Sequence, residues 1–334
     1  MENQIDNDQE LLCALSNLKV SLLQNMSQMI YGQTMLLEEI IAAFFAGGHV
    51  LLTGVPGLGK TSIVRALAQI FSLKFSRIQF TPDLTPSDVI GSNILQEVHG
   101  APRVFEFLPG PIFSNIVLAD EINRTPPRTQ SALLEAMQEE QVTVAGKGYA
   151  IEPPFFVMAT QNPIEHEGTY LLPEAQLDRF LFSLSIDYPR AGDEVAMALA
   201  TTGDRVEKCL PQVTRDVILS YQKLVRRVIV SESVAEYAVS IVRNTRPQTK
   251  NSPEITQQYV EWGAGPRATQ AALLGAKAWA ALDGRPAVSF QDIERVMPAV
   301  LRSRITLNYM ALSDGMNVDL VVKKILREAK EKIS

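Results

Sequence analysis

The chain has 334 residues, 46% of them hydrophobic, and its 37 acidic side chains outnumber 31 basic ones for a formal net charge of −6. This length allows two domains with a sizeable core. The acidic balance offers no general attraction for nucleic acids or anionic membranes, and no dense Lys/Arg block supplies a local one.

The cysteine usage and the opening of the chain indicate a compartment. Cys13 and Cys209 lack the spacing of a metal site or a disulfide framework, which fits a reducing environment. The polar, acidic opening lacks the cationic start and apolar stretch of a secretory signal. The longest apolar stretch, residues 40–46, is too short to span a bilayer. We therefore expect a soluble cytoplasmic protein without a membrane segment.

Two helices are expected before the first strand. Apolar residues recur at helical spacing over residues 10–28, and residues 37–46 form a second helical segment. Between them, Ile30, Tyr31 and Gly32 break the pattern. In a nucleotide-binding domain this break has two open interpretations, a wall for the adenine ring or ordinary core packing.

Residues 54–61 match the phosphate-binding pattern G-x-x-x-x-G-K-[ST] at every fixed position. A buried strand is predicted before them and a helix after them, which is the context that this motif requires. The glycines let backbone N–H groups turn toward the phosphates, and the helix adds the positive end of its dipole. We expect Lys60 to reach the β- and γ-phosphates and Thr61 to place its hydroxyl on Mg²⁺. The predicted nucleotide-binding residues are Gly54, Val55, Pro56, Gly57, Leu58, Gly59, Lys60, Thr61 and Ser62.

A hairpin is predicted within the following α/β units. After a strand at residues 75–80 and a helix start at residues 81–88, two strand-like runs over residues 94–107 flank a four-residue loop at residues 99–102. Phe105 and Phe107 fall on one face of the second run. They either cover the parent helix or contact a partner or substrate.

Two carboxylates end the apolar strand at residues 116–119. Asp120 is expected to bind the hydration shell of Mg²⁺, and Glu121 to polarise a water for attack on the γ-phosphate. Arg124 and Arg128 follow, on the approach to a predicted helix. Each is either a surface charge or a group that faces the nucleotide of a neighbouring subunit.

The next core strand, at residues 155–160, follows a second predicted hairpin and delivers Asn162 to the same sheet edge as Asp120. We expect Asn162 to hydrogen-bond the attacking water or the γ-phosphate, and the alternative is a turn before proline. Alternating apolar residues at 180–186 predict the last strand, with Arg179 at its head. The histidines lack metal-ligand spacing and are assigned no chemistry.

Past residue 190 the sequence predicts helices only, the strongest at residues 214–228, 231–245, 266–282, 290–301 and 318–332. We therefore divide the chain into a nucleotide-binding core, residues 1–189, and a smaller α-helical domain, residues 190–334. Arg267 lies in the first turn of one of these helices, where the dipole disfavours a cation. This placement indicates an anionic partner outside the helix, with a surface arginine as the alternative.

Together these segments resemble the AAA+ ATPases, and more narrowly the MoxR family, over nearly the whole chain after residue 10. Residues 54–61 look like its Walker A motif, 118–124 like Walker B and 159–163 like sensor 1. Residues 168–180 look like the stretch with the arginine finger. Residues 263–267 look like sensor 2, although Gly265 stands where the family usually has serine.

The resemblance implies an α/β fold in which a parallel five-stranded αβα core, with a helix-2 insert and a pre-sensor-1 hairpin, carries an all-α lid. It further implies that ATP binds where core and lid meet and that the working assembly is a ring, expected to be a hexamer. One active site is then built from two subunits, and Arg179 reaches the γ-phosphate of the next one. A trans arginine suits phosphoryl transfer because this reaction needs mainly positioning and charge stabilisation. The residues implied to act in cis are Lys60, Thr61, Asp120, Glu121, Asn162 and Arg267.

The leading functional expectation is an ATP-driven, chaperone-like remodeller of protein partners. The resemblance suggests partners with von Willebrand factor A domains, which are assembled, remodelled or loaded with metal. A nucleic-acid motor is the second hypothesis, and the acidic total and the absence of a basic, aromatic-rich hairpin disfavour it. A nucleotide-gated scaffold with negligible turnover is the third.

Overall fold

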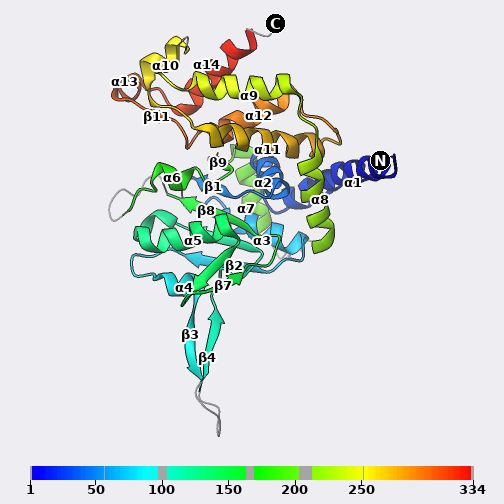
Figure 1. The fold of residues 1–334 in the computed structure, drawn as a ribbon, viewed down its shortest axis with the longest axis vertical. Coiled ribbons are helices and arrows are strands. Elements are labelled where there is room, and N and C mark those ends of the chain that lie inside the picture. The colour runs from blue at the N-terminus through cyan, green and yellow to red at the C-terminus, as the bar shows by residue number, and fades with distance from the viewer. Residues whose placement is uncertain are drawn as a thin grey trace.

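A central sheet organises the computed structural model, which describes residues 2–55, 57–96, 104–162, 169–202, 213–250 and 252–331 (Figure 1). Its five strands are parallel and lie in the order β2-β5-β8-β1-β9. This confirms the predicted α/β fold with a five-stranded parallel sheet. The strands are β1 Val50–Thr53, β2 Phe75–Gln79, β5 Ile116–Asp120, β8 Phe156–Gln161 and β9 Phe182–Ser185.

Alternate residues of the strands pack into two different cores, as expected when a sheet is covered on both faces. Leu52 and Leu118 belong to a core shared with the N-terminal helices and the lid helices. Leu51 and Val117 belong to a second core with α5. The helices of the core region are α1 Glu2–Ser27, α2 Thr34–Ala46, α3 Lys60–Ile70, α4 Pro86–Ile90, α5 Pro127–Glu139 and α6 Glu174–Leu177.

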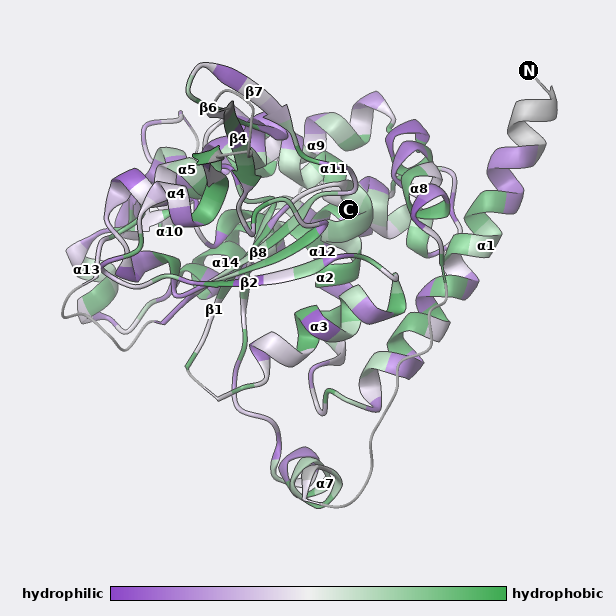
Figure 2. Cartoon of the chain, turned by 90° about the horizontal axis from the view of Figure 1, so that it is seen from below, coloured by the Kyte–Doolittle hydropathy of each residue, from purple (hydrophilic) through white to green (hydrophobic). Residues whose placement is uncertain are grey.

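The hydropathy of the chain follows this layering. In Figure 2 hydrophobic colour gathers where the central strands meet α2 and α12, whereas α1 alternates between hydrophobic and hydrophilic residues along its length. That alternation fits a helix with one face on the core and the other in water. Among the helices that the structure describes, none has a stretch apolar and long enough to cross a membrane.

Both predicted hairpins are present, and one of them protrudes far from the body of the molecule (Figure 1). It is formed by β3 Gly91–Gln96 and β4 Val104–Pro109; the other is formed by β6 Gln141–Val144 and β7 Lys147–Ala150. Phe107 stacks on Tyr149 of the second hairpin, with ring centroids 3.9 Å apart. Phe105 is instead 71% exposed, so the two phenylalanines do not share one role. The predicted loop at residues 99–102 lies outside the described residues.

The C-terminal lid is helical, but the prediction of helices only was wrong in one detail. Two short strands, β10 Val260–Trp262 and β11 Thr306–Leu307, pair antiparallel within it. They are too short to show an alternating pattern in the sequence. The helices that follow β9 are α7 Ala191–Thr201, α8 Arg215–Arg227, α9 Glu232–Asn244, α10 Glu254–Tyr259, α11 Pro266–Leu282, α12 Phe290–Leu301, α13 Tyr309–Ser313 and α14 Val318–Glu331. The division at residue 189 stays a prediction.

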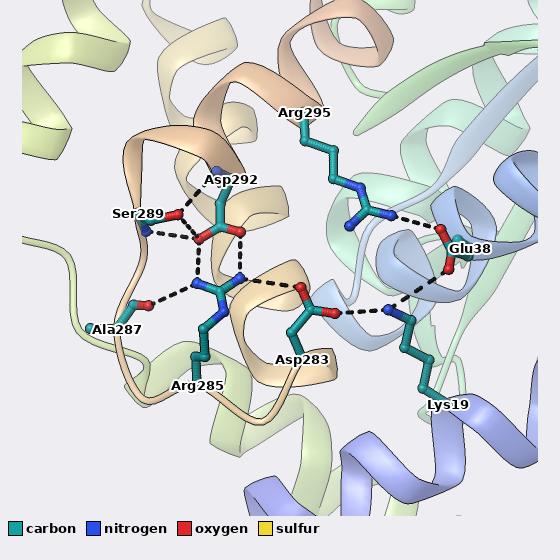
Figure 3. A network of polar contacts seen from close by, with 8 residues as sticks. All are labelled: Lys19, Glu38, Asp283, Arg285, Ala287, Ser289, Asp292 and Arg295. Atoms are coloured by element: carbon teal, nitrogen blue, oxygen red, sulfur yellow. Dashed lines mark hydrogen bonds and ion pairs between the residues drawn. The ribbon is translucent and has the colours of Figure 1, made fainter. Parts of the chain in front are cut away.

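Polar contacts hold the lid against the two N-terminal helices (Figure 3). Lys19 of α1 pairs with Asp283, which follows α11, at 2.8 Å. Arg295 of α12 pairs with Glu38 of α2 at 2.6 Å and stacks over the ring of Trp279, 3.4 Å from its centroid. These contacts join residues far apart in the sequence and fix one docked position of the lid.

Candidate nucleotide-binding site

A cavity of about 260 Å³ lies at the carboxyl end of the central strands. It brings together residues of the phosphate loop, the predicted residues at the ends of β5 and β8, and one residue that was not predicted, Arg77 of β2. Its described lining is Gly57, Gly59, Lys60, Thr61, Arg77, Asp120, Glu121 and Asn162.

The phosphate loop has the backbone that its glycines allow. Gly57 and Gly59 have φ angles of 86° and 77°, in the left-handed region that side chains disfavour. Helix α3 begins at Lys60, directly after Gly59, so its free N–H groups and positive dipole end face the cavity. Pro56 lies outside the described residues.

Lys60 is held inside this loop. Its ammonium donates a hydrogen bond to the carbonyl of Gly54. Burial lowers the pKa of Lys60, while Asp120 and Glu121 act in the opposite direction. The lysine is thus a partly desolvated cation beside two carboxylates, and a phosphate would offer it stronger anionic partners.

A buried hydroxyl sets the geometry of the acidic pair. Thr160 of β8 donates to Asp120 Oδ1 at 2.6 Å and accepts from the backbone N–H of Glu121 at 2.9 Å. Glu121 has a φ of 58° and begins a short 3-10 helix, Ile122–Arg124. Such a conformation costs on the order of 1 kcal/mol for a residue with a side chain and is typical of functional sites.

Neighbouring side chains occupy the carboxylates in this structure. Gln79 and Arg124 each donate to Glu121 Oε2 at 3.0 Å, so Arg124 contacts the acid of its own chain. Arg77 donates to Asp120 Oδ2 at 2.6 Å. Both bonds to Glu121 fall on the same oxygen, Oε2, and its role as the base that polarises a water stays a prediction.

The residues fit a bound Mg²⁺. The hydroxyl of Thr61 and the carboxylate of Asp120 line the same cavity, and both are the hard oxygen ligands that this ion prefers. Arg77 satisfies one oxygen of Asp120 in this structure, so binding of the ion would require that guanidinium to move or share.

Arg179 and Arg267 lie together in a different cavity, of about 600 Å³, which Gly48 and His49 also line. These two residues precede β1, whereas the phosphate loop follows it. The four-residue strand spans about 13 Å at about 3.3 Å per residue. In this docked position of the lid Arg267 lies beside Arg179, and its implied cis role stays a prediction.

The start of α11 lacks the cap that a serine would supply. Gly265 occupies the N-cap position with no side-chain hydrogen bond. Arg267 is 57% exposed and lies 3.9 Å from the carboxylate of Asp178. The predicted anionic neighbour is thus partly provided by the chain itself.

Residues 30–32 are not among the described residues that line the phosphate-loop cavity. Ile30 is buried in the main core, and Gly32 approaches Asp193 of α7. Core packing accounts for Ile30, and an adenine wall stays a prediction for this segment.

A phosphate loop at the carboxyl end of a parallel sheet, two acids at the end of β5, which β8 separates from β1, and a helical lid define an AAA-type ATPase. Residues 49–182 match the family described as "ATPase family associated with various cellular activities (AAA)", and residues 252–325 match the AAA lid domain. The chain belongs to the MoxR family of AAA ATPases. It therefore binds and hydrolyses ATP.

Similar proteins span most of the chain. It is 40% identical to Chaperone MoxR1 of Mycobacterium tuberculosis, over 90% of this chain and 78% of that protein. It is 45% identical to the uncharacterised protein YeaC of Bacillus subtilis, over 87% of each. A solved structure of an ATPase from Cytophaga hutchinsonii has a TM-score of 0.89 and 38% identity, covering 97% of this chain and 98% of that one.

Proposed function

We propose that this ATPase works as a ring in which each active site is completed by the neighbouring copy. The supporting observation is that Lys60 and Glu121 line one cavity while Arg179 and Arg267 line another, with β1 between the two. The two cavities share no lining residue among those described, which supports a role for Arg179 outside the phosphate loop of its own chain. Two copies placed with the second cavity against the first would join the two halves.

In this proposal the residues of the two cavities have different roles in ATP hydrolysis. Lys60 binds the β- and γ-phosphates, and Thr61 with Asp120 holds Mg²⁺, which when bound neutralises phosphate charge. Glu121 polarises the attacking water and Asn162 orients it or the γ-phosphate. Arg179, joined by Arg267, stabilises the charge that develops on the neighbour's γ-phosphate, a contribution on the order of 10³ to 10⁵ in rate.

Mixed assemblies test the shared site. Arg179→Ala and Lys60→Ala are each predicted to abolish turnover when assembled alone, because every site then lacks one half. When the two variants are mixed, some sites combine the intact Lys60 of one copy with the intact Arg179 of the other. Recovered ATP hydrolysis supports the proposal; no recovery at any mixing ratio contradicts it.

We propose further that hydrolysis drives chaperone-like remodelling of protein clients in the cytoplasm, with a hexamer as the working ring. Support comes from the similarity to a protein named as a chaperone and from the family resemblance, which suggests clients with von Willebrand factor A domains and their assembly or metal loading. The cysteines, without disulfide spacing, fit that compartment.

A captured client tests this second proposal. Glu121→Gln, held in ATP, should retain a protein with such a domain, because binding continues without turnover. Lys60→Ala is the matched control and should retain none. A client that both variants retain equally, or the absence of any client under ATP, contradicts nucleotide-driven remodelling.

A further inference from the structure

A buried arginine of the lid contacts the segment that carries Arg179. Arg304 follows α12 and its side chain is only 4% exposed. Removing a charge from water is unfavourable unless it is paired and fully hydrogen-bonded. The hydrogen-bond partners of Arg304 therefore identify the segment that this buried arginine holds in place.

Those partners lie on both sides of Arg179. Arg304 Nε donates to the Asp178 carboxylate at 2.7 Å. Its Nη2 donates to the carbonyl oxygens of Asp178 at 3.2 Å and Phe180 at 2.7 Å. The planar guanidinium holds several acceptors in a fixed fork, which a flexible ammonium does not do. Arg304 thus fixes the backbone immediately before and immediately after Arg179.

The backbone N–H of Arg179 donates to the carbonyl of Gln176 at 3.2 Å, but its side chain has little local support. Its Nε is buried and finds no hydrogen-bond partner among the described residues. Its position therefore depends on the backbone that Arg304 holds. Arg267 joins the same group, since the carboxylate of Asp178 that accepts from Arg304 also lies 3.9 Å from Arg267.

We propose that Arg304 is a positioning residue for Arg179, through which the docked lid sets where this arginine enters the neighbour's site. The inference rests on the proposed function, in which Arg179 acts in trans. A misplacement of about 1 Å can lower a catalysed rate about 100-fold. Loss of Arg304 should therefore misplace Arg179, which acts on the neighbouring copy, and leave the phosphate loop of its own copy intact.

Arg302 offers a matched control. It also follows α12 and also docks the lid, by donating to the carbonyl of Ser183 and pairing with Asp319 at 2.9 Å. Both of these partners lie outside residues 178–181, the segment that Arg304 holds. Loss of Arg302 should weaken lid docking without moving Arg179.

The experiment measures steady-state ATP hydrolysis by the full chain. Arg304→Gln is expected to lower kcat about 10- to 100-fold with KM for ATP within about threefold of the wild type. Arg304→Lys should recover part of the rate, and Arg302→Gln should stay within about twofold of the wild type. If Arg304→Gln melts below the assay temperature, Arg304→Lys is used in its place.

Mixing then identifies the impaired side. Arg304→Gln mixed with Lys60→Ala should recover activity, whereas Arg304→Gln mixed with Arg179→Ala should not, because both lack a working finger. Wild-type kcat for Arg304→Gln, or no recovery with Lys60→Ala under conditions where Arg179→Ala does recover, overturns the inference alone. Failure of Arg179→Ala to recover overturns the shared site and this inference with it.

Discussion

The backbone N–H of Glu121 donates a 2.9 Å hydrogen bond to the hydroxyl of Thr160 on the adjacent strand. The same hydroxyl donates to Asp120 at 2.6 Å. One fully buried threonine therefore holds both acids of the site and ties the positive φ of Glu121 to β8. The acid pair depends on a residue 39 positions away in the chain.

Thr160→Val removes this hydroxyl with little change in volume. We expect turnover to fall about tenfold or more, because an unpaired buried N–H costs about 1–3 kcal/mol and the strained Glu121 backbone loses its partner. Thr160→Ser keeps the hydroxyl and should keep most of the activity. Equal ATPase rates for the valine and serine variants would refute this role.

Glu121→Gln separates binding from chemistry. The amide keeps the size of the side chain but cannot polarise a water as a base, so turnover should fall about 10²- to 10⁴-fold. ATP affinity should change by less than about tenfold, since Lys60 and the loop backbone remain. Isothermal titration calorimetry measures ATP binding, and a phosphate-release assay measures turnover. Unchanged hydrolysis by Glu121→Gln would show that Glu121 is not the base.

A pH dependence follows from Glu39 of α2, which packs against the lid. Burial raises the pKa of Glu39 from 4.5 to about 7, with Glu38 and Asp319 adding to the rise and Arg302 and Arg295 opposing it. The folded state thus favours the protonated form. The contribution of protonated Glu39 to the stability of the folded state is complete below about pH 4.5 and is lost as the pH rises through about 7.

Glu39→Gln removes this titration. At pH 8 the variant should be more stable than the wild type by on the order of 2 kcal/mol, whereas at pH 5 the two should differ little. Thermal unfolding at both pH values measures the difference. Glu38→Gln is the control, because it breaks the ion pair with Arg295 and should destabilise the protein at pH 8. An equal pH slope for wild type and Glu39→Gln would contradict the assignment.

The missing cap of α11 predicts a stabilising substitution. Gly265 has φ −81° and ψ 178°, and a Cβ added there meets nothing within 4 Å. Gly265→Ser should therefore raise stability by about 0.5–1 kcal/mol through the cap and the less flexible unfolded chain. Gly263→Ser should destabilise, because a Cβ there would lie 2.3 Å from the carbonyl of Thr245. Denaturant unfolding measures the free energy of unfolding of both variants. A Gly265→Ser variant no more stable than the wild type would contradict the prediction.

Local sequence patterns were enough to predict the secondary-structure elements and the residues around the phosphate loop. Short apolar runs predicted the central strands, and the residues at their ends, Asp120 and Asn162, meet the phosphate loop because parallel strands end at one edge. Sequence reasoning missed Thr160, Arg77 and Gln79. Their roles arise from pairing between β2, β5 and β8, and the pattern of residues within a strand does not show which strands become its neighbours.

The docked position of the lid could not be predicted from the sequence pattern either. That Arg267 acts on the nucleotide of its own chain stays a prediction. The position of the lid that carries it is set by docking contacts such as Lys19 with Asp283 and Arg304 with Asp178. These pairs are separated by 264 and 126 residues. Helical periodicity shows which face of a helix is buried and does not show which element covers it.

The shared active site is tested most directly by following specific ATPase activity with protein concentration while mass photometry measures the assembled fraction. The account predicts that turnover per chain rises in step with assembly, and that Arg179→Ala assembles to the same extent but stays inactive. Constant turnover per chain from dilute monomer to full assembly would contradict it, because a single copy would then contain every residue that hydrolysis needs.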